Sequence, residues 1–259
     1  MDFALKVFKD LPEKISIPTK CQPSLINKVH FNTLHTELDS LLMNKVLEIS
    51  SHTSGICLNS LLMACYFKLM NLWSGQNDLI INMPVFNREQ HLPNAKNIIG
   101  SFLDIFPVRI QTSPQEPIVS IARKIEQFVR TMLEYPISSI ELSRKIAEQE
   151  GLKQSSLSAI IFSNSINMLP KGISHSSRYL TIGAPKVQTG APGTYIDLVM
   201  YTWENKWCFD WNYVRELFDA EYIQLLSEQF TSMLNQLVDD TNTKGYEERH
   251  VQIYSLSSI

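Results

Sequence analysis

The sequence is poor in the residues and motifs that mark several protein classes. Paired metal ligands, a glycine-rich phosphate loop and nucleic-acid-binding motifs are all missing. The six histidines are isolated from one another, and so are the four cysteines, at positions 21, 57, 65 and 208. Because no Cys-x-x-Cys pair occurs, the cysteines are predicted to be free thiols in a reducing compartment. The motifs thus predict no metal, no directly bound cofactor and no nucleic-acid partner.

Little in the sequence points to a membrane or to export. The net charge is −3 at pH 7, which gives no basic field for acidic membranes or nucleic acids. No window contains the roughly 18 consecutive apolar residues of a membrane span. The N-terminus, MDFALKVFKDLPEK, has acidic residues and no cleavable apolar segment, so it is not a signal peptide. We therefore expect a cytoplasmic protein without membrane contacts, whose 259 residues form one large domain or two small ones.

Strands alternate with long helices along the chain, and this order predicts an α/β sandwich in which helices pack on a mixed sheet. Alternating or continuous apolar runs predict strands at 27–35, 78–86, 104–111 and 158–163, and a hairpin around Glu204-Asn205-Lys206. Apolar residues at helical spacing predict helices from Thr36, at 56–73, at 116–134, at 139–150 and from Asp219. Thr36-Glu-Leu-Asp39 is interpreted as a capping box that opens the first of these helices.

Composition divides the chain into three segments. Residues 1–26, with prolines at 12, 18 and 23, are predicted to be an extended connector. Residues 27–240 contain the predicted sheet and helices, and form the folded body. The polar residues 241–259 are predicted to be a flexible tail.

The stretch from Asn82 to Phe102 has an unusual order: an apolar strand runs into a polar loop and then into the apolar IIGSF. Asn87 and Arg88 are predicted to tie the loop to backbone carbonyls, because arginine offers five donors in a fixed geometry. Gly100 permits a tight turn, and Phe102 is predicted to anchor the loop in the core.

Four stretches, in this order, resemble the C-terminal lobe of condensation domains from nonribosomal peptide synthetases. The subtype that they resemble best is the heterocyclization type. The resemblance covers roughly residues 8–238, and each motif alone is weak, whereas their order and spacing are fairly specific. The stretches are FKDLPEKISIP (8–18), the helix and strand that end in Phe-Asn-Arg (58–88), NIIGSFLDIFPVRI (97–110), and the closing strands and helix from GTYIDLVMYTW to SEQF (193–230).

The resemblance implies a fold of two lobes, each like chloramphenicol acetyltransferase, that face each other across a tunnel. Carrier proteins enter the tunnel from opposite ends and present thioesters on phosphopantetheine arms. The implied partners are therefore the N-terminal lobe, peptidyl or acyl carrier proteins and other synthetase modules. The N-terminal lobe's signatures, His-His-x-x-x-Asp-Gly or Asp-x-x-x-x-Asp, do not occur in this sequence. We therefore expect a half-domain that needs a partner, or an excised piece, inactive by itself.

Asp197 and Ser163 are the predicted catalytic residues. Asp197 lies mid-strand in YIDLVMY and is expected to share a face with Tyr195, Val199 and Tyr201. A carboxylate in an apolar strand suits acid/base work, and in cyclization domains an Asp at the matching place helps to form a thiazoline or oxazoline. The alternative for Asp197 is a structural, hydrogen-bonded carboxylate.

In the cyclization pattern, the strand before this Asp ends in Phe-Thr-Ser, and the Thr works with the Asp. This chain has Phe162-Ser163-Asn164, which keeps the hydroxyl and loses the methyl group. The alternative for Ser163 is a polar residue at a strand end. The tunnel wall or the structural framework is predicted to include Asn164, Tyr195 and the loop residues Asn87, Arg88, Gly100 and Phe102.

Two other functions remain open at this point. A degenerate lobe could dock carrier proteins or a partner synthetase without chemistry. A self-sufficient small acyltransferase is the weakest alternative, because no histidine lies in a general-base motif.

Overall fold

A mixed sheet organises the chain. The structure is a computed structural model, and it describes residues 2–86, 97–98, 100, 103–134, 138–151, 156–166 and 193–255. Within these residues six strands pair in the order β1-β6-β5-β4-β2-β3. The β2–β4 and β4–β5 pairs are parallel and the others are antiparallel. The strands are β1 (Phe31–Leu38), β2 (Asp78–Phe86), β3 (Leu103–Gln111), β4 (Ile160–Asn164), β5 (Ile196–Trp203) and β6 (Lys206–Val214).

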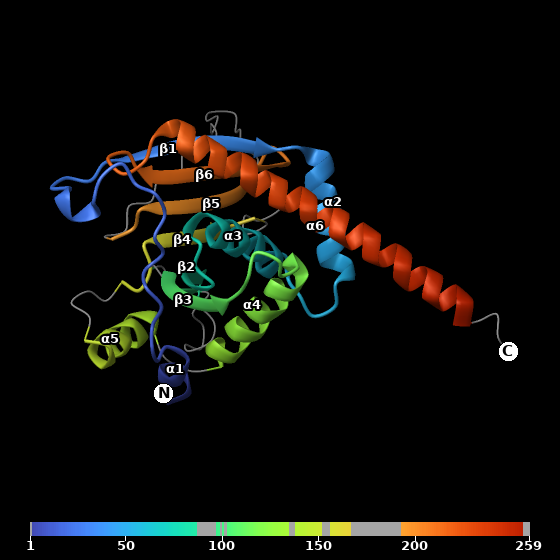
Figure 1. Cartoon of the computed structure of the whole chain (residues 1–259), viewed down its shortest axis with the longest axis horizontal. Coiled ribbons are helices and arrows are strands. Elements are labelled where there is room, and N and C mark those ends of the chain that lie inside the picture. Colours follow the sequence, from blue (N-terminus) through green and yellow to red (C-terminus); the bar gives the residue numbers. More distant parts are fainter. Residues whose placement is uncertain are drawn as a thin grey trace.

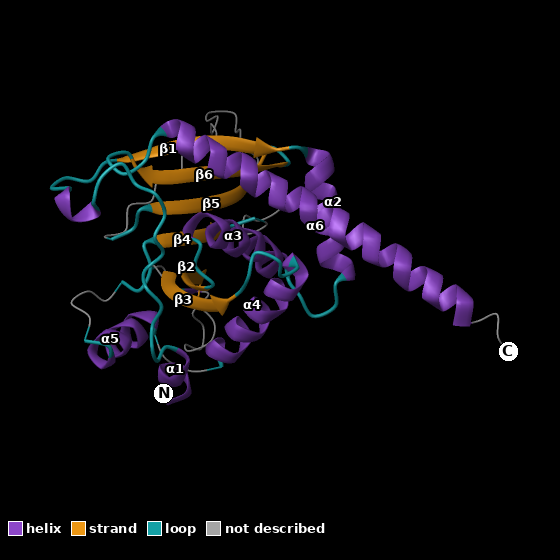
Figure 2. Cartoon of the chain, in the orientation of Figure 1, coloured by secondary structure: helices purple, strands orange, loops and turns teal. Residues whose placement is uncertain are grey.

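Helices pack on this sheet, which confirms the predicted α/β sandwich. Helix α3 contacts β2 and β4 and packs between α4 and α6, while α6 also contacts β1 and β6. Figure 1 shows α6 running past these two strands and projecting beyond the sheet, and Figure 2 separates helices from strands by colour. No helix among the described residues has both the length and the apolar character needed to cross a bilayer. The helices are α1 (Asp2–Val7), the 3-10 turn η1 (Pro23–Leu25), α2 (Ser40–His52), α3 (Leu58–Ser74), α4 (Ile118–Leu133), α5 (Ser139–Gln149) and α6 (Ala220–Ser255).

Local sequence explains the central elements. Helix α3 is apolar nearly all round. It can therefore be buried between the sheet and its neighbouring helices, and residues 60–71 are all buried there. It ends at Gly75, whose φ of 68° belongs to the left-handed region that glycine adopts without strain. The β5–β6 hairpin turns at Glu204 and Asn205, which both have positive φ, as the two-residue turns of twisted hairpins require.

The start of α2 differs from the prediction. Thr36 lies within β1, where its hydroxyl contacts Ser227 at 3.1 Å, so the proposed capping box is wrong. Asp39 is the N-cap instead, and its carboxylate accepts hydrogen bonds from the amides of Leu41 and Leu42. The pattern of polar residues revealed that a helix begins here. The strand predicted at 27–35 is displaced along the chain, because β1 pairs with β6 from Phe31 through Leu38.

The predicted connector packs tightly against the folded body. Phe8 is fully buried, and Arg109 of β3 donates hydrogen bonds to the carbonyls of Val7, Lys9 and Asp10. Arg109 also forms an ion pair with Asp78 at 2.7 Å. At the other end, α6 continues to Ser255 through most of the predicted tail, whose flexibility stays a prediction.

Glu126 joins α4 to the start of α3. Its carboxylate accepts hydrogen bonds from the Cys57 amide at 3.1 Å, the Ser60 hydroxyl at 2.7 Å and Arg130 Nε at 2.8 Å. Burial raises the pKa of Glu126, but hydrogen bonds from Cys57, Arg130 and Ser60 outweigh burial and lower the pKa from 4.5 to about 2. The ionised form is therefore the one that stabilises the fold.

Glu126→Gln should reduce the dependence of stability on acid pH. A depressed pKa in the folded state gives stability that is complete above about pH 4.5 and disappears as the pH falls toward about 2. We expect the free energy of unfolding of the unmodified chain to fall across this window, and that of Glu126→Gln to fall less. Urea unfolding at a series of pH values measures both. The exposed Glu148→Gln on α5 is the control and should follow the unmodified chain; equal slopes for all three proteins would contradict the assignment.

Candidate functional site

The sheet presents different residues on its two faces. Helices α3 and α6 bury one face, where the large side chains of β5 and β6 join the main hydrophobic core. The intervening residues point the other way, and Val199, Tyr201 and Cys208 form a separate small cluster there. We call this opposite side the second face. It carries Ile161 and Ser163 of β4, Asp197, Val199 and Tyr201 of β5, Cys208, Asp210 and Asn212 of β6, and Thr33, His35 and Glu37 of β1.

The two predicted catalytic residues are hydrogen-bonded to each other on this face. The Ser163 hydroxyl donates to Asp197 Oδ1 at 2.9 Å. The parallel register pairs Ile161 with Asp197. Ser163 lies two residues after Ile161 and therefore points to the same face. Asp197 is 1% exposed, so its carboxylate is removed from bulk water. The structure therefore brings together two residues that lie 34 positions apart in the sequence.

Burial makes the hydrogen bonds of the Asp197 carboxylate important. A buried carboxylate requires hydrogen bonds to remain charged, and the Ser163 hydroxyl supplies one of them. Burial, and then the negative charge of Asp197, raise the pKa of Tyr66 well above its ordinary value of 10. Tyr66 therefore remains a neutral phenol. An arrangement of this kind can orient a carboxylate so that it accepts or returns a proton.

The structure describes only some of the other predicted site residues. Asn164 donates to Asn59 Oδ1 at 3.1 Å and accepts from the Ile166 amide at 2.9 Å, so it links the end of β4 to α3. Tyr195 lies at a bend before β5 and is half-buried against the main core. Contrary to the prediction, it therefore does not share the face of Asp197, because the alternation of the strand begins only at Ile196. Gly100 lies at an exposed bend. Asn87, Arg88 and Phe102 lie outside the described residues, so their roles stay predictions.

Sequence reasoning missed a second network of hydrogen-bonded polar side chains on the same face. The Tyr201 hydroxyl donates to Asp210 Oδ2 at 3.1 Å, and His35 Nδ1 lies 2.7 Å from Asp210 Oδ1. Burial, and then the charge of Asp210, raise the pKa of Tyr201. The signal was present in KWCFDWNY: because Trp207, Phe209 and Trp211 share the core face, Asp210 must point to the other side. The register with β1 that brings in His35 was not visible in the sequence.

Two hollows of the surface lie away from the Ser163–Asp197 pair. One of about 400 Å³ lies between β3 and α4, beside Arg109 and Phe128. Another of about 400 Å³ lies between α2 and α6, with Glu37 at its margin. Neither is lined by Ser163 or Asp197, so the candidate site rests on the hydrogen bond between these two residues and on the burial of Asp197.

Comparison with known proteins places this fold in a family. The family model of the Condensation domain matches residues 3–252. The chain belongs to the condensation domain family. Because the match spans almost the whole chain, it includes both Ser163 and Asp197.

Relatives of this condensation-domain chain are much longer proteins. Bacitracin synthase 1 of Bacillus licheniformis is 26% identical over 250 residues, which are 94% of this chain and 5% of the relative. The cyclization-docking bidomain of the EpoB nonribosomal peptide synthetase from Sorangium cellulosum has a similar fold, with a TM-score of 0.76 and 20% identity. The similarity covers 92% of this chain and 48% of the bidomain. The chain thus spans about half the length of that solved structure.

A further solved structure shares the fold. The X-domain from teicoplanin biosynthesis, seen in a complex with OxyB, has a TM-score of 0.75 and 17% identity. The similarity covers 93% of this chain and 52% of the X-domain chain. At these identities, the solved structures support only the fold of the condensation-domain chain. Its chemistry has to be argued from the residues described above.

Ser163→Ala should destabilise the fold, because it leaves a buried carboxylate with one hydrogen bond fewer. We expect a loss of about 1–3 kcal/mol in the free energy of unfolding, measured with urea near neutral pH. Ser163→Thr keeps the hydroxyl and should recover most of the loss. Ser51→Ala, at an exposed position on α2, is the control and should change stability by less than about 0.5 kcal/mol. A Ser163→Ala variant as stable as the Ser51→Ala control would contradict a structural contribution from this hydrogen bond.

Proposed function

We propose that the chain forms the C-terminal lobe of a heterocyclization-type condensation domain. With an N-terminal lobe as the opposite wall, it would join thioesters held on the phosphopantetheine arms of carrier proteins and then close a thiazoline or oxazoline ring. The observation that carries this proposal is the hydrogen bond between Ser163 and the buried Asp197. It corresponds to the Thr and Asp that work together in the cyclization pattern, with serine in place of threonine. The EpoB cyclization-docking bidomain has a similar fold, so the proposed subtype is compatible with the architecture of this chain.

Ring closure requires proton transfer twice, and Asp197 is suited to this task. A side-chain thiol or hydroxyl of the bound peptide loses its proton as it attacks the preceding amide carbonyl, giving a ring that carries a new hydroxyl group. That hydroxyl then takes up a proton and leaves as water, while the ring nitrogen loses its proton and a C=N bond forms. In this proposal Asp197 accepts and returns the protons, and Ser163 orients the carboxylate.

The proposed partners follow from the same chemistry. Carrier proteins would deliver both thioesters, and neighbouring synthetase modules would supply and remove them. The loop that contains Asn87, Arg88, Gly100 and Phe102 would form a wall beside the tunnel. Asn164 and Tyr195 would hold the end of β4 and the start of β5 in place around the catalytic pair.

Reconstitution with Asp197→Asn tests the proposal. The chain, an N-terminal lobe with the Asp-x-x-x-x-Asp motif and two loaded carrier proteins are mixed, and the products are analysed by mass spectrometry. Ring closure is detected as the loss of one water from the linear peptide. We expect Asp197→Asn to slow ring closure by about 10²- to 10⁴-fold, the usual contribution of a general acid or base. Ser163→Thr should retain the activity.

The matched control is Asp240→Asn on α6, which should cyclize at the unmodified rate. Cyclization by Asp197→Asn at the rate of this control would contradict a catalytic role for Asp197. An unmodified mixture that makes no more product than the carrier proteins alone would remove the enzymatic proposal as a whole.

A second candidate function is a docking module without chemistry. The similarity to the X-domain, whose solved structure is a complex with OxyB, favours considering it. In that case the chain would bind carrier proteins or another biosynthetic protein, with no product formed in the reconstituted mixture. Asp197→Asn would then leave binding unchanged, because Asp197 is 1% exposed and a partner would not contact its carboxylate.

A further inference from the structure

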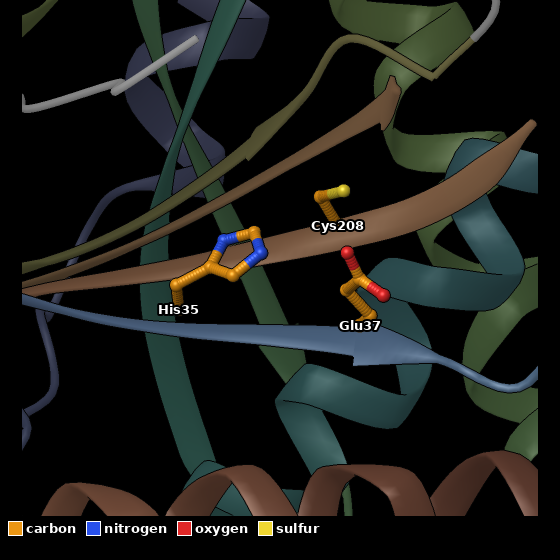
Figure 3. A group of neighbouring side chains, drawn as sticks. All are labelled: His35, Glu37 and Cys208. Atoms are coloured by element: carbon orange, nitrogen blue, oxygen red, sulfur yellow. The ribbon is translucent and has the colours of Figure 1, made fainter. Parts of the chain in front are cut away.

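Three potential metal ligands meet between β1 and β6, beyond the Ser163–Asp197 pair. His35 and Glu37 are two residues apart on β1, so both point to the second face of the sheet. Cys208 lies directly opposite Glu37 on β6. One ligand atom from each of the three lies within 4.8 Å of the other two. Figure 3 shows the His35 ring, the Glu37 carboxylate and the Cys208 sulfur converging above the two strands.

A separate observation shows that the His35 ring is held as metal-binding imidazoles are held. Its Nδ1 lies 2.7 Å from Asp210 Oδ1, so the other ring nitrogen, Nε2, is left to bind a ligand. The side chain of Asp210 is 3% exposed, and its second oxygen accepts a hydrogen bond from Tyr201. A carboxylate behind a histidine fixes the tautomer and the orientation of a metal-binding ring. Here the strand register creates that contact, because Asp210 is the cross-strand partner of His35.

We propose that His35, Glu37 and Cys208 form a binding site for Zn²⁺. A thiolate sulfur, an imidazole nitrogen and a carboxylate oxygen are the three ligand types that zinc takes in proteins. Mg²⁺ and Ca²⁺ prefer oxygen ligands alone, so the sulfur argues against them. Zinc bonds of about 2.0–2.3 Å in a tetrahedron place ligand atoms about 3.3–3.8 Å apart, so small side-chain rotations would close the site. Three protein ligands leave the fourth position for water or another small ligand.

Zinc would replace the ammonium group of Lys206 beside Glu37 and the thiol proton of Cys208. Lys206 Nζ lies 2.6 Å from Glu37 Oε2, so this ammonium group supplies the positive charge beside the carboxylate. Burial, followed by the charges of Glu37 and Asp210, raises the pKa of Cys208, so its sulfur carries a proton. Zinc would release that proton and compete with Lys206 for Glu37.

The site would cross-link β1, which lies at the edge of the sheet, to β6. Hydrogen bonds to β6 are the only strand pairing that β1 makes among the described strands. An ion that binds the folded chain and not the unfolded chain raises its stability in proportion to the logarithm of the ion concentration. A zinc-dependent increase in thermal stability is therefore the structural consequence of the proposal.

The experiment titrates the reduced, chelator-treated full chain with Co²⁺ alone and then with Zn²⁺ alone. Cobalt reports the ligands, because thiolate coordination gives a charge-transfer absorption that oxygen and nitrogen ligands do not give. We expect one cobalt ion per chain, the thiolate absorption, its loss when Zn²⁺ is added, and a higher melting temperature with Zn²⁺. Cys208→Ser should abolish the absorption, and His35→Gln should weaken binding at least about 10-fold. Asp210→Asn, which acts through His35, should weaken binding about 10- to 100-fold.

Cys57→Ser is the matched control, because Cys57 is an exposed cysteine on another element, at the start of α3. It should bind cobalt as the unmodified chain does. If Cys208→Ser does not fold, the exposed Glu37→Gln decides: a loss of affinity of about 10-fold supports the site, and unchanged affinity overturns it. The proposal is also overturned if the folded, reduced chain shows no thiolate absorption, or if the absorption persists in Cys208→Ser.

Discussion

The alternation of side chains along β5 and β6 is the constraint on which the rest of the structure depends. Leu198, Met200, Phe209 and Trp211 must point toward α3 and α6, where they join the main core. Their neighbours must then point to the second face. A register shift of one residue would turn Asp197 into this apolar core, and the free energy lost would be prohibitive. The position of the polar residues is therefore fixed by the apolar ones, which gives the second face a rigid support.

The second face holds two buried carboxylates, and each accepts a hydrogen bond from a hydroxyl group. Asp197, 1% exposed, accepts from Ser163, and Asp210, 2% exposed, accepts from Tyr201. Burying charged groups costs stability, and apolar residues of similar size would often be tolerated better. Polar groups kept in such places are found more often at functional sites than elsewhere. The same face thus supports both the proposed acid/base pair and, nearer the sheet edge, the proposed zinc ligands.

Local patterns predicted most of the fold, and the family resemblance predicted one contact of the site. The strand at 78–86, the amphipathic helix α4 and the β5–β6 hairpin were each predicted because their periodicity is contained within a short window. The Ser163–Asp197 pair was predicted through the family resemblance. The contacts of His35 with Asp210 and of Glu37 with Cys208 join β1 to β6, which are distant in sequence, so only the folded register reveals them. Thr36 was misassigned because a capping motif also fits the end of a strand.

A covalent trapping experiment tests most directly whether the second face looks onto the substrate path. Ser163→Cys and Ser51→Cys are compared in a chain whose accessible cysteines, Cys21 and Cys57, are replaced by serine. Each is assembled with an N-terminal lobe and a carrier protein whose phosphopantetheine arm ends in a thiol-reactive group. Position 51 is exposed on α2, so random collision favours it over position 163. The account predicts cross-linking predominantly at 163; cross-linking at 51 that equals or exceeds it would contradict the account.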